Sequence, residues 1–563
     1  MISNDWVQIA IYIIALVAIT PLLGSFMARV FEGEHHLLST PLGWLERGVY
    51  RASGIDAKEE MGWKTYAWTL LAFNVLGFLT VFLLQIFQAY LPLNPQQMPN
   101  VSWHLAFNTA TSFMTNTNWQ SYGGESTMSY LTQMLGLAVQ NFVSAATGIA
   151  VMLAITRGIM RRSTNSIGNF WVDLTRSTIY VLLPLSIILA LALVSQGVVQ
   201  TFSSYVEAHT LEGAKQVIAL GPAASQIAIK QLGTNGGGFF NVNSAHPFEN
   251  PTPISNWLEM FSILMIPAAL TYTYGLMVKS RRQGWVLFIA MLLLWLGGLA
   301  FSLYGEYATN PVFGTSAMME GKETRFGVVN SILWSVSTTA ASNGSVNAMH
   351  SSLSPIAGGV AMFNIMLGEI IFGGVGAGLY GMLTFVLMTV FLAGLMVGRT
   401  PEYLGKKIEK YEIAMIIVAI LLPSICILVG SGIACILPAG LSSLASKGPH
   451  GLSEILYAFS SAAQNNGSAF AGLNANTVFY NVLLGLCMWV GRFAVIFPIL
   501  AVAGSLAAKK YAPPSEGTFE TDNWIFLVLL LAVILIVGAL THLPALSLGP
   551  VIEHFLMLRG VTF

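Results

Sequence analysis

The sequence predicts an all-α polytopic membrane protein with about ten transmembrane helices. Four pseudo-repeats of helix, pore helix, filter loop and helix are expected to surround a central pore. Of the 563 residues, 55% are hydrophobic and only 9% are charged, against roughly 25% charged in a typical soluble domain. Many apolar runs exceed the ~20 residues that cross a ~30 Å hydrocarbon core. Four short Asn/Gly-rich segments recur along the chain, and a long apolar span follows each.

The rest of the composition excludes several classes of protein. Lys plus Arg and Asp plus Glu both number 25, so net charge points to no charged partner, and we expect no nucleic acid. The three cysteines lie in or beside apolar spans and form neither a disulfide framework nor a CxxC metal site. The first apolar run begins at Trp6 with no basic segment before it and no small-residue cleavage site after it. We therefore expect a retained span, not a cleaved signal peptide.

Hydrophobic length places the spans. They are expected near residues 5–30, 64–90, 126–160, 170–198, 254–280, 283–305, 359–397, 409–438, 476–508 and 523–548. Four shorter helical stretches lie between spans, near residues 102–115, 222–232, 328–341 and 452–464. Because these four are too short and too polar to cross, re-entrant pore helices are expected.

Basic residues orient the predicted spans. A basic loop follows each odd-numbered span up to the ninth, and the positive-inside rule makes such loops cytoplasmic. The residues are Arg47, Arg51, Lys58 and Lys64; Arg157, Arg161 and Arg162; Lys279, Arg281 and Arg282; Arg399, Lys406, Lys407 and Lys410; and Lys509 and Lys510. Both termini and the four short helices are then expected on the external side.

The predicted repeats divide the chain into six parts. These are an extra helix and cytoplasmic loop (1–63), four pore repeats (64–162, 163–282, 283–408 and 409–510) and an extra C-terminal helix (511–563). The third and fourth repeats match without a gap at Ser337/Ser460, Ala340/Ala463, Asn343/Asn466, Gly344/Gly467 and Ser345/Ser468. External loops are expected at 200–222 and 306–326, and no stretch is long enough for a soluble domain.

The four Asn/Gly-rich segments are the candidate site. Aligned at Asn116, Thr234, Ser342 and Asn465, they recur at spacings of 118 (234−116), 108 (342−234) and 123 (465−342). The predicted filter residues are Asn116, Thr117 and Asn118; Thr234, Asn235 and Gly236; Ser342, Asn343 and Gly344; and Asn465, Asn466 and Gly467. Glycine and asparagine accept positive φ, which lets carbonyls point inward and replace the water shell of a cation. The neutral side chains of these segments favour a monovalent cation over a divalent one. The alternative interpretation of the four segments is that they are only polar turns between helices.

Two charges are expected deeper in the membrane. Glu369 and Arg492 stand at the same offset from the aligned residues, 27 in both cases (369−342 and 492−465). Each charge costs roughly 2.5–3.5 kcal/mol at a helix centre, so we expect the two to pair. Arg492 would then place positive charge below the filter as a barrier to cations. A purely structural ion pair is the alternative, and the sequence leaves both open.

Span seven carries an unusual cluster of glycines. Gly368, Gly373, Gly374, Gly376 and Gly378 lie together in its middle. Each glycine weakens a helix by up to ~1 kcal/mol, so the cluster favours a hinge or a broken helix. Close helix packing through small residues is the alternative.

No other motif indicates chemistry. The Gly233–Gly238 run follows no strand and lacks the Lys-Ser/Thr that closes a phosphate-binding loop. The nine histidines show no metal-ligand spacing. We therefore expect no catalytic site and no bound nucleotide in this chain. Energy for active transport would come from another chain or from an ion gradient.

The segments resemble those of a known family, the potassium-transporting ATPase A chains (KdpA). The matching motifs cover residues 116–122, 233–240, 340–350 and 465–473, and the resemblance extends over essentially the whole chain. It implies a bacterial inner-membrane complex in which this subunit selects K⁺, a P-type ATPase subunit (KdpB) hydrolyses ATP, and KdpC and KdpF complete the assembly in membrane lipid. The resemblance also implies that the aligned residues and their next neighbours form the filter. Gln120 and Gly236 match positions tied to K⁺ affinity.

The resemblance further implies an indirect ion path. The broken helix of the third repeat and the Arg492 region would block straight passage, so K⁺ would leave sideways toward the ATPase subunit. Asn118 and Asn343 stand where a fourfold K⁺ filter would be expected to have glycine.

Two other functions remain as alternatives. A self-contained Trk/Ktr-like K⁺ channel or symporter would share the fourfold repeat, but the two extra spans and the long filter motifs argue against it. An intramembrane enzyme would need an activated nucleophile with a base, and no His or Lys is placed for that inside a span.

Overall fold

The spans of the computed structural model agree with the predicted fold class. The model describes residues 3–513 and 518–561, and within them ten helical stretches are long and apolar enough to cross a membrane. The helices are α1 (Ser3–Glu32), α3 (Trp63–Ile86), α6 (Val139–Met160), α7 (Phe170–Arg176) with α8 (Leu183–Ser195), α10 (Pro253–Met277), α11 (Arg281–Tyr307), α14 (Ala377–Val397), α15 (Lys410–Ile436), α18 (Val478–Ala508) and α19 (Trp524–Leu546). The all-α polytopic prediction is confirmed.

Three predicted spans differ in detail. The span expected to start at 126 starts at Thr132 as a π-helical segment, because Gly124–Thr127 forms the separate turn α5. Between α7 and α8 lies a second π-helical segment, Ser177–Leu182. After α19 the chain continues through a π-helical segment (Ser547–Val551) into α20 (Ile552–Met557). Hydropathy alone does not register such local changes of helix type.

Four short helices precede the Asn/Gly-rich segments. They are α4 (Trp103–Met114), α9 (Ala223–Leu232), α12 (Gly327–Ala340) and α17 (Gly448–Ala463). With 10 to 16 residues and a rise of about 1.5 Å per residue, none can cross a ~30 Å core. Most of the residues in these four helices are buried. The order long helix, short helix, loop, long helix therefore occurs four times.

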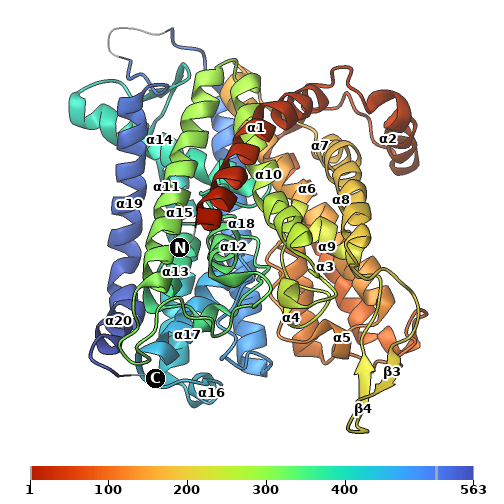
Figure 1. Ribbon diagram of the computed structural model, residues 1–563. Coiled ribbons are helices and arrows are strands. Elements are labelled where there is room, and N and C mark those ends of the chain that lie inside the picture. Colours follow the sequence, from red (N-terminus) through yellow and green to blue (C-terminus); the bar gives the residue numbers. More distant parts are fainter. Residues whose placement is uncertain (1–2, 514–517, 562–563) are drawn as a thin grey trace.

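The remaining elements lie at the two ends of the bundle. Figure 1 shows α2 (Ser39–Ser53) set apart at the upper right and the hairpin of β3 (Val206–His209) and β4 (Lys215–Ile218) projecting at the lower right. Two further pairs of short strands are β1 (Met61–Gly62) with β2 (Ser166–Gly168) and β5 (Glu402–Tyr403) with β6 (Lys406–Lys407). Two further short elements are the turns α5 (Gly124–Thr127) and α16 (Pro438–Leu441).

The amphipathic helix α2 was not predicted. Its Glu46 accepts hydrogen bonds from Arg176 (Nε–Oε1 2.9 Å) and Tyr180 (Oη–Oε2 2.6 Å), while Trp44 is exposed. These bonds lower the pKa of Glu46 although burial opposes them. An ion pair therefore joins α2 to the end of α7, and a hydrogen bond joins it to the π-helical segment that follows.

Span seven is broken, as the glycine cluster predicts. Ten residues, 367–376, separate α13 (Pro355–Met366) from α14, which begins at Ala377. Within them Gly368 and Gly376 have φ of +88° and +85°. A Cβ on Gly373 would lie 1.5 Å from the carbonyl oxygen of Glu369, so the chain turns back on itself there. A regular helix leaves no such contact, and only glycine fits it.

Candidate functional site: a ring of four loops

Four loops share one backbone conformation. We call them loop 1 (116–118), loop 2 (234–236), loop 3 (342–344) and loop 4 (465–467). At the first position of each, φ is positive: Asn116 +63°, Thr234 +46°, Ser342 +52° and Asn465 +54°. At the third position it is again positive: Asn118 +55°, Gly236 +83°, Gly344 +89° and Gly467 +97°. Four polar turns of independent origin would not repeat this alternation, which argues against the alternative interpretation.

The loop amides all turn back to the preceding short helix. At the second position each N–H donates to the carbonyl four residues before the loop: Thr117 to Ser112 (2.8 Å), Asn235 to Lys230 (2.9 Å), Asn343 to Thr338 (3.0 Å) and Asn466 to Ser461 (2.8 Å). The third-position N–H groups bond to the same four residues. Asn118 and Gly236 use the same carbonyls (3.1 and 3.2 Å), and Gly344 and Gly467 use the hydroxyls of Thr338 and Ser461 (both 2.9 Å). When successive N–H groups of a loop all point toward the short helix, the carbonyl oxygens between them are left to point away from it.

Contacts between the loops close a ring. A Cβ on Gly236 would lie 1.8 Å from the carbonyl oxygen of Asn343, which belongs to loop 3. On Gly344 it would lie 2.2 Å from that of Asn466 in loop 4. On Gly467 it would lie 2.0 Å from that of Thr117 in loop 1. The third residues of loops 2, 3 and 4 thus touch the second carbonyl of the next loop. Loop 1 joins loop 2 differently, because Asn116 Nδ2 donates to the Thr234 carbonyl at 3.2 Å, so the four loops come together in the order of the chain. We call this arrangement the ring.

The two asparagines expected at glycine positions differ. Asn118 does occupy a left-handed third position, and its amide donates to Asn141 Oδ1 at 2.6 Å. The expectation for Asn343 was wrong, because Gly344 is the left-handed third residue of loop 3. The side chain of Asn343 donates to the Lys230 carbonyl at 3.0 Å, as that of Asn466 donates to the Thr338 carbonyl at 3.0 Å. Asn343 therefore tethers loop 3 to the short helix before loop 2.

Gln120 supports loop 2 from outside the ring. Its Nε2 donates to the Gly238 carbonyl at 3.0 Å, and its Oε1 accepts from the Gly238 N–H at 2.8 Å. This paired bond links the segment after loop 1 to the segment after loop 2. A longer or charged side chain at position 120 would break both bonds.

Aromatic side chains brace loops 3 and 4. Trp334 Nε1 donates to the Ser345 carbonyl at 2.8 Å. Tyr457, at the same offset of eight residues before its loop, places its hydroxyl 2.7 Å from Ser468 Oγ. His350 Nδ1 lies 2.8 Å from that hydroxyl, and burial lowers its pKa to about 3. The sequence analysis missed these residues, although the common offset of Trp334 and Tyr457 was a visible signal.

Glu369 and Arg492 lie close together beside the first residues of the loops. Arg492 Nη2 lies 3.7 Å from Glu369 Oε1, and both side chains are almost fully buried. Arg492 Nε also donates to the carbonyl of Thr115, directly before loop 1, at 2.6 Å. From the break in span seven, Val375 donates its N–H to Thr234 Oγ1 at 2.7 Å. The pair and the break thus lie directly against loops 1 and 2.

Little space remains below the ring. The cavity lined by Thr115, Asn116, Val375, Tyr380 and Arg492, among others, measures about 10 Å³, which is barely room for one water molecule. The glycines of the break make this closure possible. A Cβ on Gly376 would lie 2.1 Å from the Gly148 carbonyl on α6, and one on Gly378 would collide with Gly373. Gly374 leaves room for the Glu369 carboxylate, 3.2 Å from its hypothetical Cβ.

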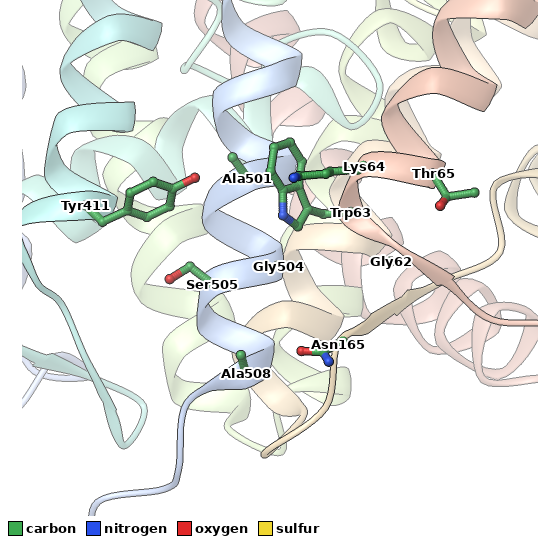
Figure 2. Close-up of a pocket in the computed structure, with 10 residues that line it drawn as sticks. All are labelled: Gly62, Trp63, Lys64, Thr65, Asn165, Tyr411, Ala501, Gly504, Ser505 and Ala508. Carbon is green, nitrogen blue, oxygen red and sulfur yellow. The ribbon is translucent and has the colours of Figure 1, made fainter.

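A larger cavity lies away from the ring. It measures about 450 Å³ and is lined by the ends of α3, α15 and α18, with Trp63, Lys64, Tyr411 and Ser505 among its residues (Figure 2). Ser505 is between three and four turns, or about 20 Å, along α18 from Arg492. In the described part of the chain, no group of three or more His, Cys, Asp or Glu side chains could hold a metal ion. The ring, whose loop N–H groups bond back to the short helices, is therefore the candidate site.

Comparisons with known proteins are consistent with this geometry. The family model described as potassium-transporting ATPase A subunit matches residues 10–555. A potassium-transporting ATPase potassium-binding subunit from Rhodospirillum centenum is 59% identical and is aligned over 100% of this chain and 99% of its own length. The protein of the same description from Herpetosiphon aurantiacus is 58% identical over 99% of this chain and 100% of its own length.

A solved structure resembles the chain in fold. The potassium transporter TrkH from Vibrio parahaemolyticus superposes with a TM-score of 0.51 and 14% sequence identity. The match covers 88% of this chain and 96% of the TrkH chain. At this identity the likeness concerns the fold alone.

Proposed function

Because the chain belongs to the family of potassium-transporting ATPase A subunits, we propose that it is the K⁺-binding and K⁺-selecting membrane subunit of an ATP-driven potassium uptake pump. The single observation that carries this proposal is the closed ring of four loops with their amides turned away from it. Backbone carbonyls that converge in this way can replace the hydration shell of a monovalent cation. K⁺ is then the transported substrate of the complex.

In the proposed mechanism, the twelve loop residues form the selectivity filter. K⁺ enters from the external side and exchanges its water for carbonyls of Asn116, Thr117 and Asn118; Thr234, Asn235 and Gly236; Ser342, Asn343 and Gly344; and Asn465, Asn466 and Gly467. Because the loop N–H groups are already bonded to the short helices, the ring holds its shape without the ion. Gln120 keeps loop 2 in register with loop 1.

Below the filter, we propose that Arg492 and the break at residues 367–376 stop K⁺ from passing straight through. The small cavity and the Arg492 contact with Thr115 support this barrier. The guanidinium repels a cation that reaches the inner end of loop 1, and Glu369 compensates its charge within the membrane. Gly373, Gly374, Gly376 and Gly378 give the break its tight path. K⁺ would leave sideways.

The proposed assembly follows the family resemblance. A P-type ATPase subunit, KdpB, would hydrolyse ATP and take K⁺ from this chain, and KdpC and KdpF would complete the complex. We propose that this chain binds no nucleotide and lies in the bacterial inner membrane with both termini outside. The four pore repeats (64–162, 163–282, 283–408 and 409–510) and the two extra helices are proposed with the boundaries that the sequence predicts.

Flux measurements test the proposed function. We expect liposomes that contain this chain alone to show no sustained K⁺ flux, and liposomes that contain the co-purified complex to move K⁺ when ATP is present. Passive flux through the chain alone would instead indicate a Trk/Ktr-like channel or symporter and would overturn the pump proposal.

Replacing Gly236 tests whether loop 2 contacts the ion. Gly236→Asp places a carboxylate against the carbonyl oxygen of Asn343, so we expect K⁺ to be preferred less strongly over Rb⁺ and Na⁺ in K⁺-stimulated ATP hydrolysis by the complex. Gly213→Asp is the matched control, because Gly213 is also left-handed (φ +84°) but has no atom within 4 Å of its hypothetical Cβ. An unchanged ion preference in the Gly236 variant would remove loop 2 from the filter.

A further inference from the structure

A fully buried ion pair lies behind loop 2, at a position where the other three loops have a hydroxyl-bearing residue. The residues four positions before the loops are Ser112, Lys230, Thr338 and Ser461. Three of them carry a hydroxyl, but Lys230 carries a charge. Its Nζ forms an ion pair with Glu249, and the side chains are 1% and 0% exposed. Its Nζ also lies 3.2 Å from Ser244 Oγ.

Lys230 is the main acceptor for loop 2. Its carbonyl receives the N–H groups of Asn235 (2.9 Å) and Gly236 (3.2 Å) and, from loop 3, the side-chain amide of Asn343 (3.0 Å). Loops 3 and 4 use a hydroxyl for the third-position amide, whereas loop 2 uses this carbonyl alone. A displacement of Lys230 would therefore move two loops at once.

Glu249 holds the other end of loop 2. Its Oε1 accepts the N–H of Phe240 at 2.8 Å, four residues after the loop, while its Oε2 meets Lys230. The ion pair thus bridges the short helix before the loop and the segment after it. A rigid bridge across both ends fixes the path between them, which includes the carbonyls of Thr234, Asn235 and Gly236.

The cluster extends to loop 3 through Ser244, Glu259 and Gln231. Ser244 Oγ donates to Glu259 Oε2 at 2.9 Å, and Gln231 Nε2 donates to the same oxygen at 2.8 Å. Ser345, directly after loop 3, donates its hydroxyl to Gln231 Oε1 at 2.9 Å. All these side chains are fully buried, and hydrogen bonds are stronger in such a low-dielectric environment than in water.

We propose that the Lys230–Glu249 ion pair is a positioning element that sets the carbonyl geometry of loop 2, and through it the affinity and ion preference of the ring. The inference rests on the proposed function, because affinity is read out as K⁺ dependence. Lys230 and Glu249 do not touch the ion. They act through Asn235, Gly236 and Phe240.

Charge variants of the purified complex test this role. Lys230→Met and Glu249→Gln each leave one buried charge unpaired, whereas the double variant removes both charges. We expect the double variant to assemble better than either single variant. It should still raise the K⁺ concentration for half-maximal ATP hydrolysis by about tenfold, with a smaller change in maximal rate. The preference for K⁺ over Rb⁺ should fall as well.

A second buried pair in the same chain supplies the matched control. Lys322 Nζ and Glu306 Oε2 lie 2.9 Å apart, with side chains 0% and 1% exposed. Their other side-chain bonds go to the Glu320 carbonyl and the Ser354 N–H, outside the four loops. Lys322→Met/Glu306→Gln makes the same change of charge at the same burial. It should lower the thermal stability of the complex but leave its K⁺ dependence and ion preference unchanged.

The outcomes separate the inference from the proposed function. If the wild-type complex shows no K⁺-dependent ATP hydrolysis, the proposed function fails. If the wild type is K⁺-dependent and the double variant keeps its K⁺ dependence and ion preference, the positioning role alone is overturned. Should the charge variants fail to assemble, Ser244→Ala decides, since it removes the hydroxyl beside Lys230 without changing charge. A severalfold loss of apparent K⁺ affinity supports the inference, and wild-type affinity overturns it.

Discussion

Loops 3 and 4 reach the ring geometry by a different route from loops 1 and 2. In loops 3 and 4 the preceding helix supplies a hydroxyl for the third-position amide and an aromatic brace for the outer segment. Loops 1 and 2 lack that brace. Their support comes from Asn141 on α6, from Gln120 and from the Lys230–Glu249 pair.

The difference teaches that the backbone path, not the side-chain set, is what the four loops share. The positive φ values and the amide bonds to the preceding helix recur in all four. The side chains that secure them do not. A ring of carbonyls requires equivalent oxygen positions, and several kinds of buried hydrogen bond can hold them.

The largest effect is expected at Arg492, which links loop 1 to the third repeat. Its side chain contacts the carbonyl before loop 1 and, in the third repeat, Glu369 and Tyr380. Arg492→Met leaves Glu369 buried without a cation, and breaking such a pair costs about 3 kcal/mol or more. We expect poor assembly or loss of transport, measured as complex yield and ATP-driven K⁺ uptake. Normal uptake would show that the pair is dispensable.

A smaller effect is expected from the hydroxyls of loops 3 and 4. Ser461→Ala leaves the partly buried Gly467 N–H without its acceptor, which costs about 1–3 kcal/mol. Apparent K⁺ affinity should fall by about tenfold in K⁺-stimulated ATP hydrolysis. Ser112→Ala is the comparison in loop 1. There the Asn118 N–H keeps its acceptor, the Ser112 carbonyl, and only the bond from the Ser112 hydroxyl to the Trp119 carbonyl (2.9 Å) is lost, so we expect a smaller loss of affinity. Equal losses in the two variants would contradict the distinction between the loops.

The aromatic braces should matter less. Tyr457→Phe removes the contacts of the hydroxyl with Ser468 and His350, and one hydrogen bond contributes about 0.5–1.5 kcal/mol. We expect a two- to fivefold loss of apparent K⁺ affinity at similar maximal rate. Tyr90→Phe, at an exposed tyrosine, should leave both values unchanged. If Tyr457→Phe matches the wild type, loop 4 does not depend on its brace.

The smallest expected effect concerns acid pH. Burial lowers the pKa of His350 from its ordinary value of 6.5 to about 3. Below pH 6.5 the unfolded chain therefore binds a proton that the folded chain does not, so His350 reduces stability as pH falls toward 3. His350→Gln should flatten the decline in thermal stability of the complex between pH 6.5 and 5. An equal decline in variant and wild type would remove His350 as its cause.

Much of the architecture could be predicted from the sequence. Span length, the basic loops and the recurring Asn/Gly segments depend on local composition, which is why ten spans, four short helices and the break in span seven were found. Glu369 and Arg492 stand at equal offsets from the aligned loop residues, which correctly predicted that they lie close together. The role of Asn343 was misjudged, because its position in the loop is decided by which neighbour takes positive φ.

The buried supports could not be predicted in this way. Lys230 and Glu249 are 19 residues apart in different kinds of segment, and neither lies at a spacing that marks a motif. His350 and Tyr457 are separated by 107 residues. From the sequence, charged or polar residues of this kind are predicted to lie in exposed loops. Only the tertiary structure shows that they are buried.

The sequence by itself determined which segments cross the membrane, where the chain leaves helical geometry and which residues stand at the four loops. These properties follow from hydrophobic length and from the backbone freedom of glycine and asparagine, both of which act locally. The tertiary structure alone decided that the loops close in cyclic order, that the space below them is filled, and that an ion pair secures loop 2. Those features depend on contacts between distant segments, and close packing sets them only once the helices have assembled.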